Sequence, residues 1–319
     1  MPDINFADPE VYFDGNKYWA FATQNGSTKI QVAQSDSASK NWHLLMDGDK
    51  SYEGLTRTGS WSTGQNVWAP SVFQNINGQY VMYYSAAMAS STGQHCIGVA
   101  ISNSVQGPYV PYVGDNGDVP LPNCDLGNGG SIDGSVFLDP KDNNRVYLVY
   151  KVDGNNVNKP TPIMLQRMSY DGLTIDKHFD PQQLITNDAA DGPVVEAPNI
   201  IYINEKYVLF FSSNAYNTPL YDVSYAYTAD LLTTDGWTKT TTPLLKTNNP
   251  FGGMTAPGGA SALVNSDGVT GDLYFHANCP GVDSSSAKRC MYYIPITSEV
   301  DDSGAVSIHY RYHGYLMYM

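Results

Sequence analysis

The chain has 319 residues, enough to bury a large core, and only 15% of them are charged. Its net charge of −14 leaves no basic surface for phosphates, which argues against nucleic acids and anionic membranes as partners. No stretch approaches the roughly 20 apolar residues of a membrane-spanning helix, and the 24 tyrosines suit a neutral, polyhydroxylated ligand because sugar faces stack on aromatic rings.

Five short segments of similar shape recur along the chain, and each leads into a strand-like run. In chain order they are Phe6–Val11, Trp68–Phe73, Ser131–Val136, Val194–Ile200 and Gly259–Val264. Aligned on Asp8, Ala69, Asp133, Ala197 and Ala260, they lie 61, 64, 64 and 63 residues apart. A near-constant interval of this kind indicates a closed, radial architecture.

The residues between these segments read as hairpins. Polar turns such as Asn77-Gly78 and Asn204-Glu205 precede runs of β-branched and aromatic residues. A repeat of this length holds four short strands, so we predict an all-β fold, a five-bladed β-propeller in which four-stranded sheets surround a channel. We expect residues 1–319 to form one catalytic domain. A β-sandwich, the alternative, would not explain five such repeats.

Three of the five segments carry an acidic residue, namely Asp8, Asp133 and Glu196. If the segments are the innermost strands, these carboxylates converge at one mouth of the channel, as acid/base hydrolysis of a glycosidic bond requires. Glu196 lies one position early, in the place of Trp68, so we expect it to enter the pocket at a different angle. Taken singly, Asp8 and Asp133 are also typical of turns, whereas a buried, unpaired Glu196 would be costly.

The four cysteines predict two disulfides in an oxidising compartment. Cys279 and Cys290 bracket a loop between two strand-like runs and would clasp a hairpin, which leaves Cys96 to pair with Cys124. Four free, buried thiols are the alternative. The glycosylation acceptor Asn25-Gly26-Ser27 agrees with secretion, so we expect an extracellular protein.

At these residues the chain resembles glycoside hydrolase family 43, which comprises inverting arabinofuranosidases, arabinanases, β-xylosidases and some galactanases on a five-bladed propeller. The resemblance runs from Asp8 to about Ile296. It rests on four motifs in order, Ala7-Asp8-Pro9-Glu10-Val11, Trp68-Ala69-Pro70-Ser71-Val72, Ser131-Ile132-Asp133-Gly134-Ser135-Val136 and Glu196-Ala197-Pro198-Asn199. It implies that Asp8 is the general base, that Glu196 is the general acid, and that Asp133 orients the acid and adjusts its pKa.

Six further residues are candidates for substrate binding: Trp68, Lys151, Asn214, Tyr216, His276 and Arg289. Arg289 aligns with an arginine that reaches the substrate in many family members, and a surface salt bridge is its alternative role. Trp68 and His276 could instead pack in the core. Many members also carry a histidine in the fifth blade that helps to bind a central ion or water. Here the matching stretch, Ala256–Ser261, has a glycine, so we expect no metal or other cofactor and doubt a channel calcium.

The sequence therefore predicts a monomeric, inverting hydrolase of plant cell-wall polysaccharide, with α-L-arabinofuranosidase or arabinanase favoured. One alternative is a β-D-xylosidase or galactanase of the same family. Another is a carbohydrate-binding propeller without catalysis, which would explain the tyrosines, the acidity and the disulfides equally well. A retaining fructosidase, whose two carboxyl groups would lie about 5–5.5 Å apart, is a third.

Overall fold

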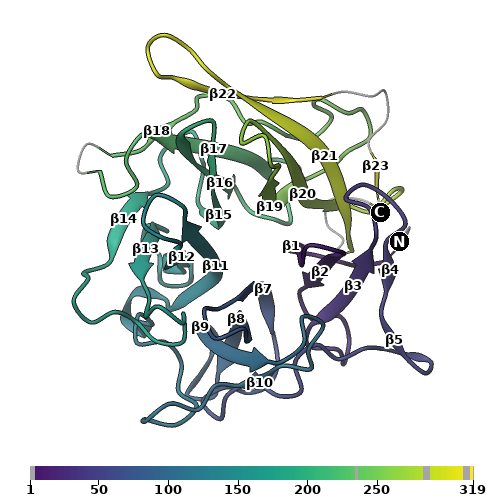
Figure 1. The fold of residues 1–319 in the computed structure, drawn as a ribbon, viewed down its shortest axis with the longest axis vertical. Helices are drawn as coiled ribbons and strands as arrows, with labels where there is room; N and C mark the ends of the chain where they lie inside the picture. The colour runs from purple at the N-terminus through teal and green to yellow at the C-terminus, as the bar shows by residue number, and fades with distance from the viewer. Residues whose placement is uncertain (1–3, 234–235, 283–287, 312–316, 319) are drawn as a thin grey trace.

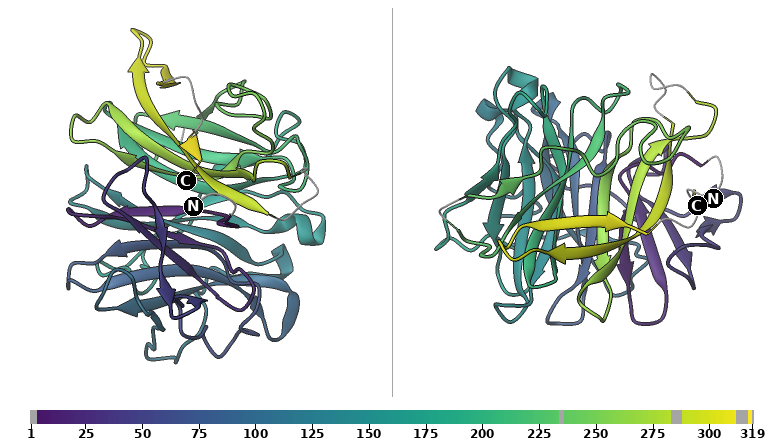
Figure 2. Two further views of the ribbon diagram at one scale, coloured as in Figure 1. Left: turned by 90° about the vertical axis from the view of Figure 1, so that its right-hand side faces the viewer. Right: turned by 90° about the horizontal axis from the view of Figure 1, so that it is seen from above.

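The computed structural model describes residues 4–233, 236–282, 288–311 and 317–318. Five antiparallel sheets stand around a common centre, and the first strand of each sheet lies nearest that centre (Figure 1). The strands of each sheet follow one another in chain order, and the last sheet gains an extra strand. This arrangement confirms the predicted all-β, five-bladed β-propeller. Viewed from the side, the blades pack face to face (Figure 2).

The strands of each blade run outward from the centre. Their bounds, blade by blade, are β1 (Glu10–Phe13), β2 (Tyr18–Ala22), β3 (Gln31–Ser35) and β4 (His43–Leu44); β7 (Trp68–Gln74), β8 (Tyr80–Met88), β9 (Ser91–Ser102) and β10 (Val110–Pro111); β11 (Ser131–Asp139), β12 (Arg145–Val152), β13 (Ile163–Arg167) and β14 (Gln182–Ile185); β15 (Val195–Ile203), β16 (Lys206–Ser213), β17 (Asp222–Thr228) and β18 (Thr238–Lys239); β19 (Gly258–Val264), β20 (Thr270–Asn278), β21 (Arg289–Val300) and β22 (Val306–Tyr310), with β23 (Met317–Tyr318) paired to β21. A small hairpin, β5 (Met46–Asp47) and β6 (Lys50–Ser51), and two short 3-10 helices, η1 (Leu126–Asn128) and η2 (Gly154–Val157), lie in the connections.

Buried apolar clusters fill the spaces between neighbouring blades. The cluster that closes the ring packs Phe6, Val11 and Trp42 of the first blade against Tyr274 and Tyr293 of the fifth. The backbone amide of Phe6 also donates to the carbonyl of Arg289 at 2.7 Å. The two ends of the repeat are therefore joined directly, as a closed propeller requires.

Each innermost strand has the same backbone feature at its start or just before it, one residue in the left-handed region. The φ angles are 53° at Asp8, 44° at Ala69, 56° at Asp133, 50° at Ala197 and 57° at Gly259. In blades two to five the strand pairing also shifts at this residue. We call these five residues the strand starts. The predicted alignment is thus right in four blades and wrong in the fifth, where Gly259 rather than Ala260 is the equivalent residue.

A side chain of the preceding blade accepts a hydrogen bond from the backbone amide of every strand start. The pairs are Asp8 with His276 Nδ1 (3.1 Å), Ala69 with Thr23 Oγ1 (3.0 Å), Asp133 with Ser85 Oγ (3.1 Å), Ala197 with Asp133 Oδ2 (2.9 Å) and Gly259 with Ser212 Oγ (2.9 Å). A residue other than glycine is strained when its backbone lies in the left-handed region, and this conformation persists only where the surroundings fix it. These five hydrogen bonds supply that constraint and link each blade to the next.

Both predicted disulfides are present. Cys96 on β9 pairs with Cys124 at a Cα–Cα distance of 5.5 Å, and Cys279 pairs with Cys290 on β21 at 4.9 Å. The second bridge therefore adjoins Arg289, as the hairpin clasp predicted. Within the described part of the chain, no helix has the length and apolar character needed to cross a membrane.

Candidate active site

A cavity of about 310 Å³ adjoins the central channel, and Asp8, Asp133 and Glu196 all line it. Each comes from the beginning of a different blade, as the repeat predicts. Asp8 and Asp133 are themselves strand starts with a left-handed backbone, whereas Glu196 is the residue before the strand start Ala197. The other side chains in the wall include Trp68, His95, Lys151, Asp153, Tyr216, Tyr221 and Arg289.

Asp8 is held as a carboxylate by donors on two sides. Arg289 Nη1 lies 3.4 Å from Oδ1, and the Thr23 hydroxyl donates to Oδ2. Burial alone would raise the pKa of Asp8, but the Arg289 charge and the Thr23 hydrogen bond help to lower it below its usual range. An ionised carboxylate of this kind is suited to accept a proton from water.

Asp133 lies in the opposite electrostatic environment. Its Oδ2 accepts the amide hydrogen of Ala197, and among the described residues no cation forms an ion pair with it. Burial, followed by the negative charge of Glu196, raises the pKa of Asp133 to about 7. Asp133 therefore keeps its proton to a higher pH than an ordinary carboxyl group does.

Both oxygens of Glu196 are held. Lys151 Nζ donates to Oε2 at 3.0 Å, and the Tyr221 hydroxyl donates to Oε1 at 2.8 Å. Burial and the nearby charge of Glu196 raise the pKa of Tyr221 well above its usual value, so this hydroxyl stays protonated and remains a donor. Two fixed donors restrict the carboxyl group to one orientation in the cavity wall.

Four of the predicted binding residues line the cavity, and three of them, Trp68, Tyr216 and Arg289, are partly exposed there. Trp68 lines it and stacks on His95, with ring centroids 3.8 Å apart, so one face of the indole is already covered. Tyr216 is 48% exposed, and the guanidinium carbon of Arg289 lies 5.1 Å from its ring centroid. Lys151 also lines the cavity but is only 1% exposed.

Two predicted binding residues lie outside this wall. The side-chain amide of Asn214 packs over Gly192, because its backbone, at a φ of 65°, donates to Asp191 and Val194. His276 is fully buried behind Asp8 and contacts it through Nδ1. Burial and the neighbouring Arg289 lower the pKa of His276, so its ring is neutral. The structure thus places His276 where it supports Asp8 from behind.

Four residues of the site were missed from the sequence: Thr23, His95, Asp153 and Tyr221. A signal existed for Asp153, since it is an acidic residue directly beyond the end of β12 and two positions after Lys151. Tyr221 reaches Glu196 from the connection before β17, and Thr23 follows β2 directly. No spacing in the sequence marks either residue.

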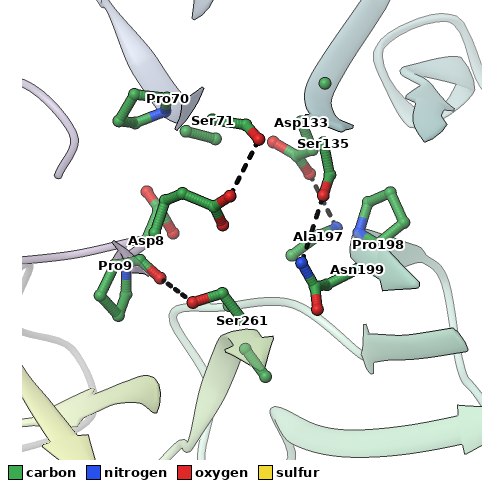
Figure 3. Close-up of a pocket in the computed structure, with 15 residues that line it drawn as sticks. Asp8, Pro9, Pro70, Ser71, Asp133, Ser135, Ala197, Pro198, Asn199 and Ser261 are labelled. Atoms are coloured by element: carbon green, nitrogen blue, oxygen red, sulfur yellow. Dashed lines mark hydrogen bonds between the residues drawn. The ribbon is translucent and has the colours of Figure 1, made fainter. Parts of the chain in front are cut away.

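The channel beneath the cavity is narrow, about 40 Å³, and is lined mainly by small residues of the five innermost strands (Figure 3). Figure 3 shows Ser71, Ser135, Asn199 and Ser261 around it. Ser71 donates to Glu10 at 3.0 Å, and burial raises the pKa of Glu10 to about 8. Calcium takes six to eight oxygen ligands, several from carboxylates, and no group of three His, Cys, Asp or Glu among the described residues is placed to hold a metal.

Comparison with known proteins identifies the family of this chain. The sequence model of glycosyl hydrolases family 43 matches residues 3–297. An extracellular endo-α-(1→5)-L-arabinanase of Thermotoga petrophila is 35% identical over 114 residues, which are 33% of this chain and 23% of that protein. A second, from Bacillus subtilis, is 28% identical over 111 residues, 34% of this chain and 23% of that protein. The matched stretch thus spans about a quarter of these curated relatives.

Solved structures share the fold over nearly the whole chain. A thermostable family-43 glycoside hydrolase superposes with a TM-score of 0.75 at 24% identity, covering 98% of this chain and 94% of that one. An α-L-arabinofuranosidase from Lactobacillus brevis gives 0.71 at 20% identity, with 97% and 96% covered. With the family match over residues 3–297, the conclusion is that this chain belongs to glycosyl hydrolases family 43.

Proposed function

We propose that this protein is an inverting glycoside hydrolase that cleaves α-L-arabinofuranosyl linkages in plant cell-wall arabinan, with residues 1–319 as a single catalytic domain. The observation that carries the proposal is the asymmetry of the carboxylates in one cavity. Asp8 is kept ionised by Arg289, while burial and the neighbouring Glu196 charge raise the pKa of Asp133 to about 7. Two carboxyl groups with opposite protonation are what this chemistry needs.

In the proposed reaction Asp8 takes a proton from the attacking water, and Glu196 gives a proton to the leaving oxygen. Inversion needs a separation of about 6.5–9.5 Å between the two carboxyl groups, so that the water fits between base and sugar. Asp133 keeps the acid side supplied with a proton, because its pKa of about 7 lies above that of an ordinary carboxyl group. The remaining negative charge stabilises the oxocarbenium-like transition state.

The names of the relatives support arabinan as the substrate and secretion as the destination. The two relatives from Thermotoga petrophila and Bacillus subtilis are both called extracellular arabinanases, and the two disulfides suit an oxidising compartment. Xylosidase or galactanase activity and a binding module without catalysis are the other outcomes of the test. A panel of aryl α-L-arabinofuranoside, β-D-xyloside and β-D-galactoside substrates, with linear arabinan, distinguishes them.

The test compares Glu196→Gln and Asp8→Asn with the wild-type protein, reading the product anomer by proton NMR. We expect Glu196→Gln to lose most turnover on arabinan but to recover it on a dinitrophenyl arabinofuranoside, whose leaving group needs no proton. Asp8→Asn should stay inactive on both substrates. Glu205→Gln, an exposed position between β15 and β16 of the same blade, is the matched control. Retained configuration, or unchanged turnover in Glu196→Gln, would overturn the proposal.

A further inference from the structure

Lys151 breaks a pattern that the second, fourth and fifth blades share. The residue just before a strand start pairs across the sheet with a fixed partner: Trp68 with Ser85, Glu196 with Ser212 and Gly258 with His276. Each of these partners accepts the amide of the next blade's strand start. In the third blade the same pairing joins Ile132 to Lys151. An ammonium group has donors only, so Lys151 cannot accept that amide.

Asp133 takes over the missing acceptor role by binding the amide of Ala197. The lysine is thereby free to reach the neighbouring residue, and its Nζ lies 3.0 Å from Glu196 Oε2. The chain thus places a cation beside Glu196 at the one blade junction where the repeated acceptor is absent.

Lys151 is deeply buried, and a second carboxylate accompanies it. Asp153 Oδ1 lies 3.0 Å from Nζ, and the two residues are 1% and 3% exposed. Burial alone would lower the pKa of Lys151, but Glu196 and Asp153 outweigh it and raise the pKa, so the lysine stays charged. A buried charge is expensive unless it is paired, and an acceptor serine would have avoided that expense.

We propose that Lys151, balanced by Asp153, is a positioning residue that sets the pH at which Glu196 gives up its proton. This rests on the proposed function, in which Glu196 is the general acid. The lysine favours the ionised form of Glu196, whereas the negative charges of Asp133 and Asp153 favour the protonated form. Of the more distant groups, Asp8 is paired with Arg289, and His276 is neutral. The Tyr221 hydroxyl is neutral as well.

The sign of the effect follows from these charges. A general acid works only while it is protonated, so kcat/KM falls as the pH rises through the pKa of the Asp133–Glu196 pair. Removing the lysine charge raises that pKa and moves the alkaline limb of the profile to higher pH. Removing the Asp153 charge lowers the pKa and moves the same limb to lower pH. Two neighbouring substitutions with opposite shifts are not expected from a loss of packing.

The experiment measures kcat/KM against pH for Lys151→Met, Lys151→Arg and Asp153→Asn on an aryl α-L-arabinofuranoside. We expect the alkaline limb to move about 1–3 pH units to higher pH in Lys151→Met and to lie near its wild-type position in Lys151→Arg. In Asp153→Asn it should move to lower pH. Thermal unfolding of each variant checks that it is folded. If Lys151→Met does not fold, Asp153→Asn still tests the proposal, because it keeps the lysine.

Unmoved limbs in the folded variants would overturn the inference, and so would a rise in KM alone, which would make Lys151 a substrate contact. A failure of the proposed function looks different. In that case Glu196→Gln keeps its turnover on arabinan, whatever Lys151→Met does to the pH profile.

Discussion

The amide of Ala197 donates to Asp133 Oδ2 at 2.9 Å, which joins the third and fourth blades one residue away from Glu196. In the other four blades the equivalent acceptor is a serine, a threonine or a histidine. Asp133 therefore has two separable properties, a hydrogen-bond acceptor that holds the backbone and a carboxyl group that retains a proton.

Two substitutions at this position separate those properties. Asp133→Asn keeps an acceptor for Ala197 and tolerates the left-handed backbone, so we expect near wild-type stability with kcat lowered by about 10²–10⁴. Asp133→Ala leaves the amide without its partner, so we expect a further loss of about 1–3 kcal/mol in the free energy of unfolding. Urea unfolding with kcat measurements checks both, and equal stability of the two variants would contradict the structural role.

Arg289→Met should change the acidic limb of the activity profile. Asp8 must be ionised to act as a base, and Arg289 lowers its pKa. Without that charge the pKa of Asp8 rises, so activity is lost at a higher pH as the solution is acidified. We expect a shift of about 1–3 pH units in kcat/KM. Arg311→Met, an exposed arginine bonded to Thr297 on the same blade, should leave the limb in place.

Tyr216→Ala should weaken substrate binding with little effect on stability, because the side chain is 48% exposed at the cavity. One aromatic face lost from a bound sugar should cost about 0.5–1 kcal/mol of binding free energy, so we expect KM to rise about two- to fivefold while kcat changes little. Tyr170→Ala is the matched control, since Tyr170 also covers an arginine, Arg145, at 3.9 Å but lies outside the cavity. Equal KM changes in both variants would argue against a binding role for Tyr216.

Replacing each pair of cysteines by serine should lower the free energy of unfolding by about 2–4 kcal/mol. The bridge Cys96–Cys124 closes a sequence separation of 28 residues and Cys279–Cys290 one of 11, so the first replacement should cost more on the chain-entropy account. Thermal and urea unfolding in oxidising buffer give the comparison. A larger loss from Cys279–Cys290 would show that local packing, not chain entropy, dominates.

Much of the fold followed from one periodic feature. The interval between acidic and small residues identified four strand starts correctly, because the left-handed backbone recurs with the repeat. The fifth was displaced by one residue, since the alignment took the small residue Ala260, whereas the left-handed residue is the glycine before it. Both disulfides could be predicted because Cys279 and Cys290 flank one hairpin and leave a single remaining pair.

The candidate site was less predictable, because contacts across blades leave no local pattern. Lys151 was expected to bind substrate, yet its ammonium group is occupied by Asp153 and Glu196. Asn214 follows β16 as expected, but its backbone hydrogen bonds turn the side chain away. Tyr221 depends on the path of the connection before β17, which the sequence does not reveal. The catalytic roles themselves remain predictions for the experiments above.

The shared backbone of the strand starts separates scaffold from chemistry. Acidic side chains occupy two of these five equivalent places, whereas Ala69, Ala197 and Gly259 carry almost no side chain. At each of these positions the backbone geometry is fixed by the hydrogen bond of its own amide and not by the side chain it carries. The side chain of Ala69 takes no part in these contacts, so Ala69→Asp should add a third acidic group at the channel without loss of the backbone geometry.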